Sequence, residues 1–261
     1  MTNTAKRLPV VASYGGGTNS TAMLIGMVDR REPCDLILFA DTGGEKPHTY
    51  EHNERFSAWL VEHGMPPITV VRKGGKPETL EENCLRMKML PSIAYGFKGC
   101  SHKYKIEPQD SFCNNNSVCR ATWDAGNKVV KLIGFDMDEP HRAQIPEDKK
   151  YRYRYPLIEW GWGREECVQA IERAGLPLPG KSACFFCPSS KKVEIKVLRR
   201  MYPDLAARAV AMERNAELTE VKGLGRSFAW GDLYEAEDRQ TDLFGETTIQ
   251  QECMCYDGEA A

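Results

Sequence analysis

Residues 13–20 read SYGGGTNS and lie between an apolar run and a helix-like run. Consecutive glycines leave backbone N–H groups bare, and a helix starting just after them adds a positive end, so together they form an anion site. The loop has neither the Lys of G-x-x-x-x-G-K-[ST] nor the spacing of G-x-G-x-x-G. A flexible strand-to-helix turn is the alternative. We predict a phosphate site formed by Ser13, Gly15, Gly16, Gly17, Thr18, Asn19 and Ser20.

A second motif with chemical potential is SACFFCPSSKK at 182–192, in which Cys184 and Cys187 are spaced as Cys-x-x-Cys with a proline after them. Such a pair binds zinc, binds an iron-sulfur cluster, or cycles as a dithiol. The spacing alone does not choose among these. Zinc requires two more ligands, which Cys253 with Cys255, or Cys100 with either of them, could supply. A buried apolar turn with inert thiols is the remaining alternative.

Three charged residues are candidates for catalysis. Asp41 follows a predicted strand at its carboxyl end, where ligands of open α/β sheets gather, and a carboxylate there suits a ribose hydroxyl or Mg²⁺. Lys105 and Arg142 are cations suited to neutralising phosphate or a developing pyrophosphate charge. The alternatives are a turn carboxylate for Asp41 and solvated surface charges for the two cations.

The elements that must position these residues follow an alternating order. Apolar runs predict strands at 9–14, 35–41, 68–72 and 127–135, and helical spacing predicts helices at 20–31 and 48–64. Strands that alternate with helices favour an α/β fold, a Rossmann-like parallel sheet with helices on both faces.

The rhythm changes after the fourth predicted strand. The run IPEDKKYRYRY at 145–155 is expected to be a charged, exposed connection, followed by a helix at 164–175, the cysteine pair and long helical segments around 190–218. We expect a boundary near residue 155. The predicted domains are a nucleotide-binding α/β domain, 1–155, and a smaller helical C-terminal module with the Cys-x-x-Cys site, 156–261.

Composition limits the class of protein. The chain has 261 residues and a formal charge of −2, which does not indicate extended nucleic-acid contact. It contains no apolar run long enough to span a membrane and begins without a signal-peptide core, so we expect a soluble, cytoplasmic protein. Ten cysteines in a reducing compartment call for an explanation. Three of them, Cys34, Cys84 and Cys167, lie in apolar or helical settings and are expected in the core.

Five segments, in order, resemble one family. GGGTNS (15–20) is similar to the S-G-G-x-D-S pyrophosphate loop, or PP-loop, of the adenine nucleotide alpha hydrolase superfamily, which includes ATP pyrophosphatases and sulfonucleotide reductases. The other four resemble segments of its phosphoadenosine phosphosulfate (PAPS) reductase-like branch, bacterial or phage type: ADTGGEKPHTY (40–50), CSHKYKIEP (100–108), GFDMDEPHR (134–142) and YPLIEWGWGREECVQAI (155–171).

The resemblance implies further site residues and cofactors. Thr42 and Gly43 join Asp41 in the nucleotide site, with ATP (or PAPS or APS) and Mg²⁺ bound. Cys100, Cys184 and Cys187 stand where cluster-bearing relatives place their ligands, which implies a [4Fe-4S] cluster, with zinc as the alternative. The implied fourth ligand is Cys255, or else Cys253.

Departures from the family pattern affect the expected chemistry. Gly15 and Asn19 stand at the loop's Ser and Asp positions, which removes a hydroxyl and a carboxylate from the phosphate site. Ser101 stands where cluster-bearing relatives have the second cysteine of a Cys-Cys pair. The C-terminal ECGLH motif, whose cysteine is the nucleophile of true reductases, is only weakly similar to QECMCYDG (251–258). These departures weigh against reductase chemistry.

The expected function is that of an ATP-dependent sulfur transferase-like enzyme, which activates an acceptor by adenylation, releases pyrophosphate and then places sulfur. The alternatives are a PAPS or APS reductase, with a cysteine nucleophile, and a zinc-stabilised, nucleotide-binding regulatory protein without turnover. Expected partners are an adenine nucleotide, a sulfur donor such as a cysteine desulfurase, and an acceptor, for which nucleic acid is one candidate. The oligomeric state stays open, with a dimer as one alternative.

Overall fold

The computed structural model describes residues 7–74 and 78–244, with the side chains of 240–244 left out. Contacts between residues divide this part of the chain into two compact units. Unit 1 consists of 7–41, 47–74 and 106–182, and unit 2 of 42–46, 78–105 and 183–244. Each unit is therefore assembled from segments that are distant in the sequence.

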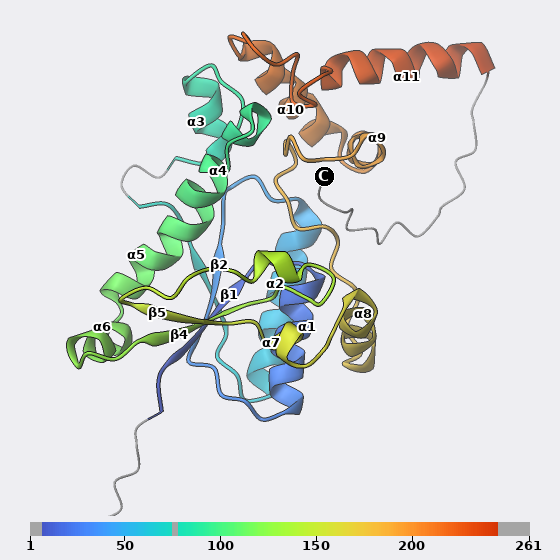
Figure 1. Ribbon diagram of the computed structural model, residues 1–261. Helices are drawn as coiled ribbons and strands as arrows, with labels where there is room; N and C mark the ends of the chain where they lie inside the picture. Colours follow the sequence, from blue (N-terminus) through green and yellow to red (C-terminus); the bar gives the residue numbers. More distant parts are fainter. Residues whose placement is uncertain (1–6, 75–77, 245–261) are drawn as a thin grey trace, which may run out of the picture. The chain divides into compact units, whose positions relative to one another are not determined.

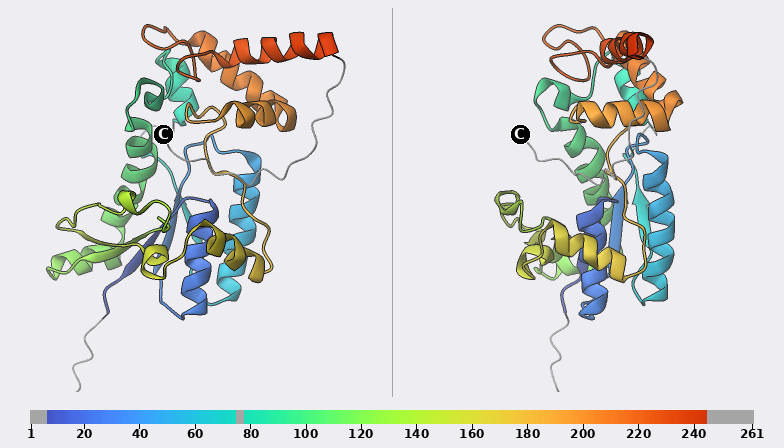
Figure 2. Two further views of the ribbon diagram at one scale, coloured as in Figure 1. Left: turned by 45° about the vertical axis from the view of Figure 1, so that its right-hand side comes forward. Right: turned by 90° about the vertical axis from the view of Figure 1, so that its right-hand side faces the viewer.

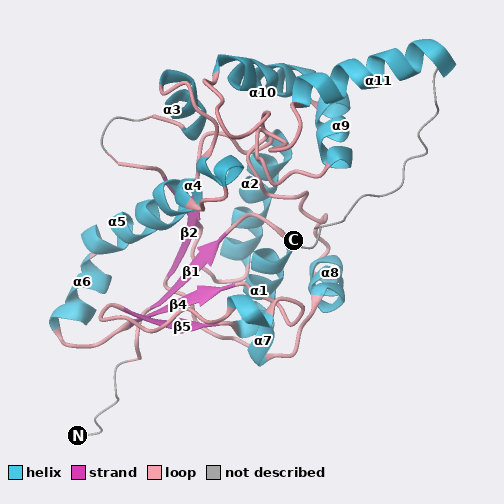
Figure 3. Cartoon of the chain, turned by 45° about the horizontal axis from the view of Figure 1, so that its top comes forward, coloured by secondary structure: helices cyan, strands magenta, loops and turns pink. Residues whose placement is uncertain are grey.

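Unit 1 is built on a parallel five-stranded sheet with strand order β3-β2-β1-β4-β5. Figure 3 shows the strands running in a common direction. Their bounds are β1 Val10–Tyr14, β2 Leu36–Ala40, β3 Ile68–Val71, β4 Val129–Ile133 and β5 Tyr151–Arg154. The chain leaves β1 toward β2 on one side and returns to β4 on the other, which creates a topological switch point at the carboxyl ends of β1 and β4.

Helices cover both faces of this sheet. Alternate strand residues such as Ala12 and Leu132 pack with α1, α2 and α8, whereas Val11 and Val129 pack with cysteines of α5 and α6 on the opposite face. Figure 1 shows α5 and α6 to the left of the strands and α1, α2 and α8 to their right. The helices of unit 1 are α1 Thr18–Asp29, α2 Pro47–Glu62, α5 Glu107–Asn115, α6 Ser117–Asp124, α7 Pro156–Glu159 and α8 Arg164–Arg173.

Unit 2 is helical. Its helices are α3 Leu80–Arg86, α4 Gly99–Ser101, α9 Lys192–Met201, α10 Pro203–Asn215 and α11 Trp230–Phe244. In Figure 2, α9 to α11 are drawn in orange and red and α3 in teal. Helix α10 packs against α3, α9 and α11. An apolar cluster that includes Phe185, Phe186 and Trp230 forms the core of the unit. The shorter helical turns of the described chain are Ser92–Tyr95, His102–Ile106 and Pro140–Arg142.

The α/β prediction is confirmed, since all four expected strands are present and the sheet is parallel with helices on both faces. Part of 145–155, expected as an exposed connection with a strand edge as the alternative for KKYRYRY, is the edge strand β5: Tyr151–Arg154 pairs with β4. Tyr151 is buried while Arg152 is exposed, so the charged residues of this edge strand reach solvent without disturbing the sheet. The three cysteines expected in the core, Cys34, Cys84 and Cys167, are buried.

The two units do not follow the expected division near residue 155. Residues 156–182 belong to unit 1, because α8 packs along α1. Conversely, 78–105 belong to unit 2, where α3 packs on α10. Among the described helices, none combines the length and the apolar character that crossing a bilayer requires.

Candidate functional site

The glycine loop lies where β1 ends and α1 begins. Tyr14 is the last residue of β1, and Gly17 is the extended N-cap residue of α1. Most N-cap residues accept a hydrogen bond from the first helical turn through a side-chain oxygen. Gly17 has no side chain and provides no such cap, so the amides of the first turn of α1 point to a place suited to an anion.

Gly16 gives the loop its shape. Its φ of 75° lies in the left-handed region, which favours glycine. A Cβ at this position would lie 3.1 Å from Asn53 Oδ1, 3.2 Å from Thr49 Cγ2 and 3.3 Å from Phe39 Cε2. The loop backbone therefore lies close to α2 and β2, and a side chain at position 16 is strained by the positive φ and crowded by its neighbours.

A second loop meets the first at the switch point. Gly134 follows β4, and a Cβ there would lie 3.1 Å from the backbone N and Cα of Ser20. The segment after β4 thus runs directly over the first turn of α1. The carboxyl ends of β1 and β4 lie at the switch point, the position at which open α/β sheets bind ligands.

Hydroxyl groups hold the loop in place. Ser13 Oγ donates to Gln109 Oε1 of α5 at 2.7 Å, and Ser20 Oγ accepts from Gly15 N at 3.2 Å. Ser182 Oγ donates to the carbonyl oxygen of Gly15. Thr18 is buried at the start of α1. The sequence-predicted residues 13 and 15–20 are therefore brought together in unit 1 as one ordered turn.

The side chain of Asn19 belongs to a hydrogen-bond network beside the loop. Its Nδ2 donates to Asp136 Oδ2 at 2.7 Å, and its Oδ1 accepts from Arg164 Nη1 at 3.3 Å. Burial raises the pKa of the Asp136 carboxyl, and the hydrogen bond from Asn19 offsets part of that rise. Asp136 follows a predicted strand, so its place at the carboxyl end of β4 could have been inferred. No signal in the sequence pointed to Arg164.

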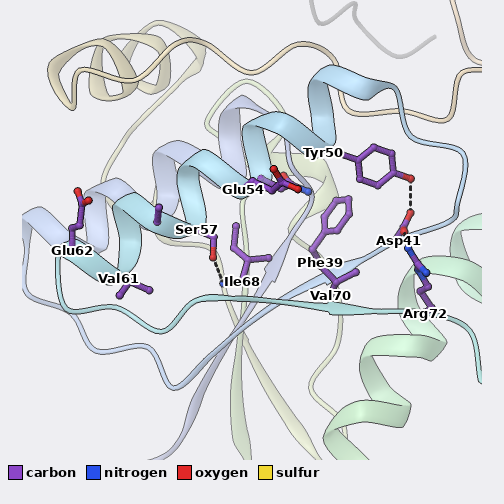
Figure 4. Close-up of a pocket in the computed structure, with 12 residues that line it drawn as sticks. Phe39, Asp41, Tyr50, Glu54, Ser57, Val61, Glu62, Ile68, Val70 and Arg72 are labelled. Atoms are coloured by element: carbon purple, nitrogen blue, oxygen red, sulfur yellow. Dashed lines mark hydrogen bonds and ion pairs between the residues drawn. The ribbon is translucent and has the colours of Figure 1, made fainter.

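Asp41 is buried and engaged by its neighbours. Tyr50 donates to its Oδ1 at 2.8 Å, and Arg72 donates to its Oδ2 through Nε at 2.9 Å and Nη2 at 2.7 Å. Figure 4 shows these three residues at one end of a cavity of about 660 Å³, whose walls come from α2, β2 and β3. The cavity has the volume of a small-molecule site. Asp41 thus connects α2 to the segment after β3, through its hydrogen bonds with Tyr50 and Arg72.

Arg142 lies on the segment after β4, as expected, at the surface. Its Nη1 donates to Glu139 Oε2 at 2.6 Å, and its guanidinium lies 4.4 Å from the centre of the Phe135 ring. Almost half of the side chain is exposed. Its charge is therefore paired with a neighbouring carboxylate. Because the pair is exposed to solvent, it contributes little to stability.

Thr42 and Gly43, the other predicted nucleotide ligands, belong to unit 2. Thr42 Oγ1 and Cys184 Sγ form a hydrogen bond of 3.1 Å. A Cβ on Gly43, whose φ is 74°, would lie 2.3 Å from Thr79 Cγ2. Within their unit these two residues contact the cysteine turn and the start of α3.

Lys105 is the partner of a buried carboxylate in unit 2. Its Nζ lies 3.2 Å from Glu45 Oε1, and the Glu45 side chain is fully buried. Although burial works against its charged form, the Glu45 carboxylate and the neighbouring Cys184 raise the pKa of Lys105 above its ordinary value. Burial, and then the charge of Glu45, raises the pKa of the Cys184 thiol to about 12. Sequence reasoning missed Glu45, which lies 60 residues before its partner.

The cysteines of unit 2 share one apolar cluster. Cys184 is buried, and Cys100 and Cys187 are partly buried around it. Across residues 7–74 and 78–244, no three His, Cys, Asp or Glu side chains are grouped so as to hold a metal ion. The thiols suit a cluster chemically, but Cys100, Cys184 and Cys187 do not assemble its ligand set here. Cys253 and Cys255 lie outside the described residues.

No protein-family model matches the chain, and no curated protein matches it in sequence. Among solved structures, the chain is similar to the U34-tRNA thiolase NcsA from Methanococcus maripaludis, described with its [4Fe-4S] cluster. The TM-score is 0.45 and the identity 16%, over 82% of this chain and 74% of that chain. This degree of likeness transfers no functional property to the chain.

Proposed function

We propose that the chain is an enzyme of the PP-loop ATP pyrophosphatase superfamily, in which the loop 15–20 holds the phosphates of ATP. The observation that carries the proposal is the uncapped glycine turn at the switch point of unit 1. Its donors are backbone N–H groups, which attract phosphate without a lysine. The order of the five family-like segments agrees with this assignment.

The reaction we propose is adenylation followed by sulfur transfer, as in a PAPS reductase-like sulfur transferase. An acceptor oxygen attacks the α-phosphorus of ATP, the bond to the β-phosphate oxygen breaks, and pyrophosphate leaves. Hydrosulfide from a separate donor then attacks the activated carbon, the C–S bond forms as the C–O bond breaks, and AMP leaves with the acceptor oxygen. The loop donors stabilise the negative charge that develops on the departing pyrophosphate. Mg²⁺, when bound, would supply further charge neutralisation.

Product analysis tests this proposal against its two alternatives. Purified full-length chain is incubated with Mg²⁺ and ATP, or with PAPS and a dithiol reductant, with and without candidate acceptors. AMP and pyrophosphate from ATP are expected. Sulfite from PAPS would instead identify a sulfonucleotide reductase. Nucleotide binding with neither product, across all the acceptors offered, would favour a regulatory protein.

A further inference from the structure

The side chain of Asn19 is held from two sides. It lies in the first turn of α1, donates to Asp136 and accepts from Arg164. Asp136 is only 3% exposed, and its second oxygen accepts from Asp138 N at 3.2 Å. Asp138 in turn accepts from Arg164 N at 2.9 Å. The segment after β4 therefore connects the first turn of α1 to the first turn of α8.

These hydrogen bonds orient the side-chain amide of Asn19, which could otherwise bind the backbone N–H groups at the start of α1. Asn side chains near a helix start readily accept hydrogen bonds from backbone N–H groups of the first turn. Those same N–H groups are the donors that the proposed function assigns to the phosphates, and we call them the anion seat of the glycine loop. Because Asp136 and Arg164 engage both ends of the Asn19 amide, the side chain is directed away from them.

The charges around Asn19 also offset one another. The carboxylate of Asp136 lies on one side of the amide and the guanidinium of Arg164 on the other. In the loop pattern that this chain resembles, position 19 is itself an Asp. Here the carboxylate comes from the segment after β4 instead, and a neutral amide lies between it and the loop.

We propose that Asp136 is a positioning residue for the phosphate loop: it holds the Asn19 amide away from the first turn of α1 and so keeps the backbone donors open to nucleotide phosphate. The inference rests on the proposed function, because it concerns the same anion seat. It adds a residue, from a different loop, on which nucleotide affinity depends.

A double-mutant cycle on ATP affinity tests the mechanism. An amide at position 136 has one acceptor oxygen where Asp136 uses two, so Asp136→Asn should release Asn19 and weaken ATP binding about tenfold. In an Asn19→Ala background there is no competing amide, so adding Asp136→Asn should change affinity less than about twofold. Calorimetry with Mg²⁺ and ATP, well below the unfolding temperature, gives the four dissociation constants.

A second variant keeps the test decisive if Asp136→Asn alone does not fold. Arg164→Met removes the other hydrogen bond that holds the Asn19 amide and keeps the bond from Arg164 N to Asp138. It should weaken ATP binding about threefold in the wild-type background and change it less than about twofold in the Asn19→Ala background. Equal losses in both backgrounds would overturn the proposal.

Asp138→Asn is the matched control, because it perturbs the same segment without touching Asn19. It should leave ATP affinity unchanged. Equal losses from Asp136→Asn in both backgrounds would mean that Asp136 is merely structural, and would overturn the inference. Failure of the wild-type chain to bind ATP would instead contradict the proposed function itself, so the two failures are distinguishable.

Discussion

The glycine loop of unit 1 and the cysteine turn of unit 2 use different parts of the chain for their chemistry. In the loop, the groups proposed to hold an anion are backbone N–H groups, and hydroxyl side chains hold the turn in place. Near the cysteine turn the polar groups are side chains: Lys105 pairs with the buried carboxylate of Glu45, and burial raises the pKa of the Cys184 thiol to about 12. A backbone site depends on conformation, whereas a side-chain site depends on charge balance.

The two sites therefore respond to different substitutions. A change that adds a Cβ to the loop removes the conformation on which binding depends. A change that removes one charge in unit 2 leaves another charge buried without its partner, which is costly for stability. Substitutions in the loop should therefore act on nucleotide binding, and substitutions at the buried ion pair of unit 2 should act on stability.

The largest expected effect follows from Gly16→Val. The positive φ strains a valine, and Asn53, Thr49 and Phe39 crowd it, so the loop must shift and ATP affinity should fall by about 100-fold. Gly64→Val is the matched control, because Gly64 has a φ of 77° but nothing within 4 Å of its Cβ position. Calorimetry on both folded variants checks the prediction. Equal affinities would show that the loop does not hold the nucleotide.

Lys105→Met should have the next largest effect, on stability. It leaves the fully buried carboxylate of Glu45 without its cation, which should lower the free energy of unfolding by about 3 kcal/mol. Adding Glu45→Gln removes the isolated charge and should restore most of that loss. Chemical denaturation measures the series, with Lys103→Met as the control at a neighbouring exposed lysine.

The same double variant tests whether Lys105 has a role beyond its pairing with Glu45. If Lys105 also neutralises nucleotide phosphate, Glu45→Gln/Lys105→Met should be stable yet bind ATP more weakly than wild type. Unchanged ATP affinity would restrict Lys105 to its pairing with Glu45 and would contradict the catalytic role expected from the sequence.

The stability of unit 1 should depend on pH through His52. Burial, and then the charges of Arg55 and His48, lowers the pKa of His52 to about 4 from its ordinary value of 6.5. The unfolded chain therefore binds more protons between these values, and stability falls as the pH is lowered through this window. From pH 7 to pH 5 the loss should be about 1 kcal/mol, after allowance for solvent screening. Denaturation at both pH values should show a smaller loss in His52→Gln and the full loss in His63→Gln.

Arg142→Gln should have the smallest effect. Because its charge is paired with Glu139 and almost half exposed, stability should change by less than about 0.5 kcal/mol. If Arg142 assists the departing pyrophosphate, turnover should fall about threefold, while Lys191→Gln leaves it unchanged. Steady-state release of pyrophosphate measures both variants. Identical rates would remove Arg142 from the proposed site.

The features that the sequence predicted are local ones. The four expected strands, the helix after the glycine loop and the loop itself are each specified by a short run of apolar or glycine residues. The edge strand β5 was left as an alternative to an exposed linker, because the charges of KKYRYRY mask the alternation in which Tyr151 faces the core. Helices α5 and α6 were not predicted either, although they cover one face of the sheet.

The features that sequence reasoning missed depend on long-range contacts. Asp136 and Arg164 meet Asn19 across separations of 117 and 145 residues, and Glu45 meets Lys105 across 60. Apolar periodicity and residue spacing carry no information on such pairs until the sheet order is known. The residue types at these sites were visible in the sequence, but their partners were not.

The proposed function rests on backbone N–H groups between Gly16 and Ser20 that hold the phosphates of ATP. Proton-nitrogen correlation spectra of protein labelled with ¹⁵N-glycine report directly on two of these amides, those of Gly16 and Gly17. On addition of Mg²⁺ and ATP, the resonances of Gly16 and Gly17 should shift strongly, while those of Gly64 and Gly126 stay in place. ATP binding that leaves both loop resonances unmoved would contradict the proposed phosphate site.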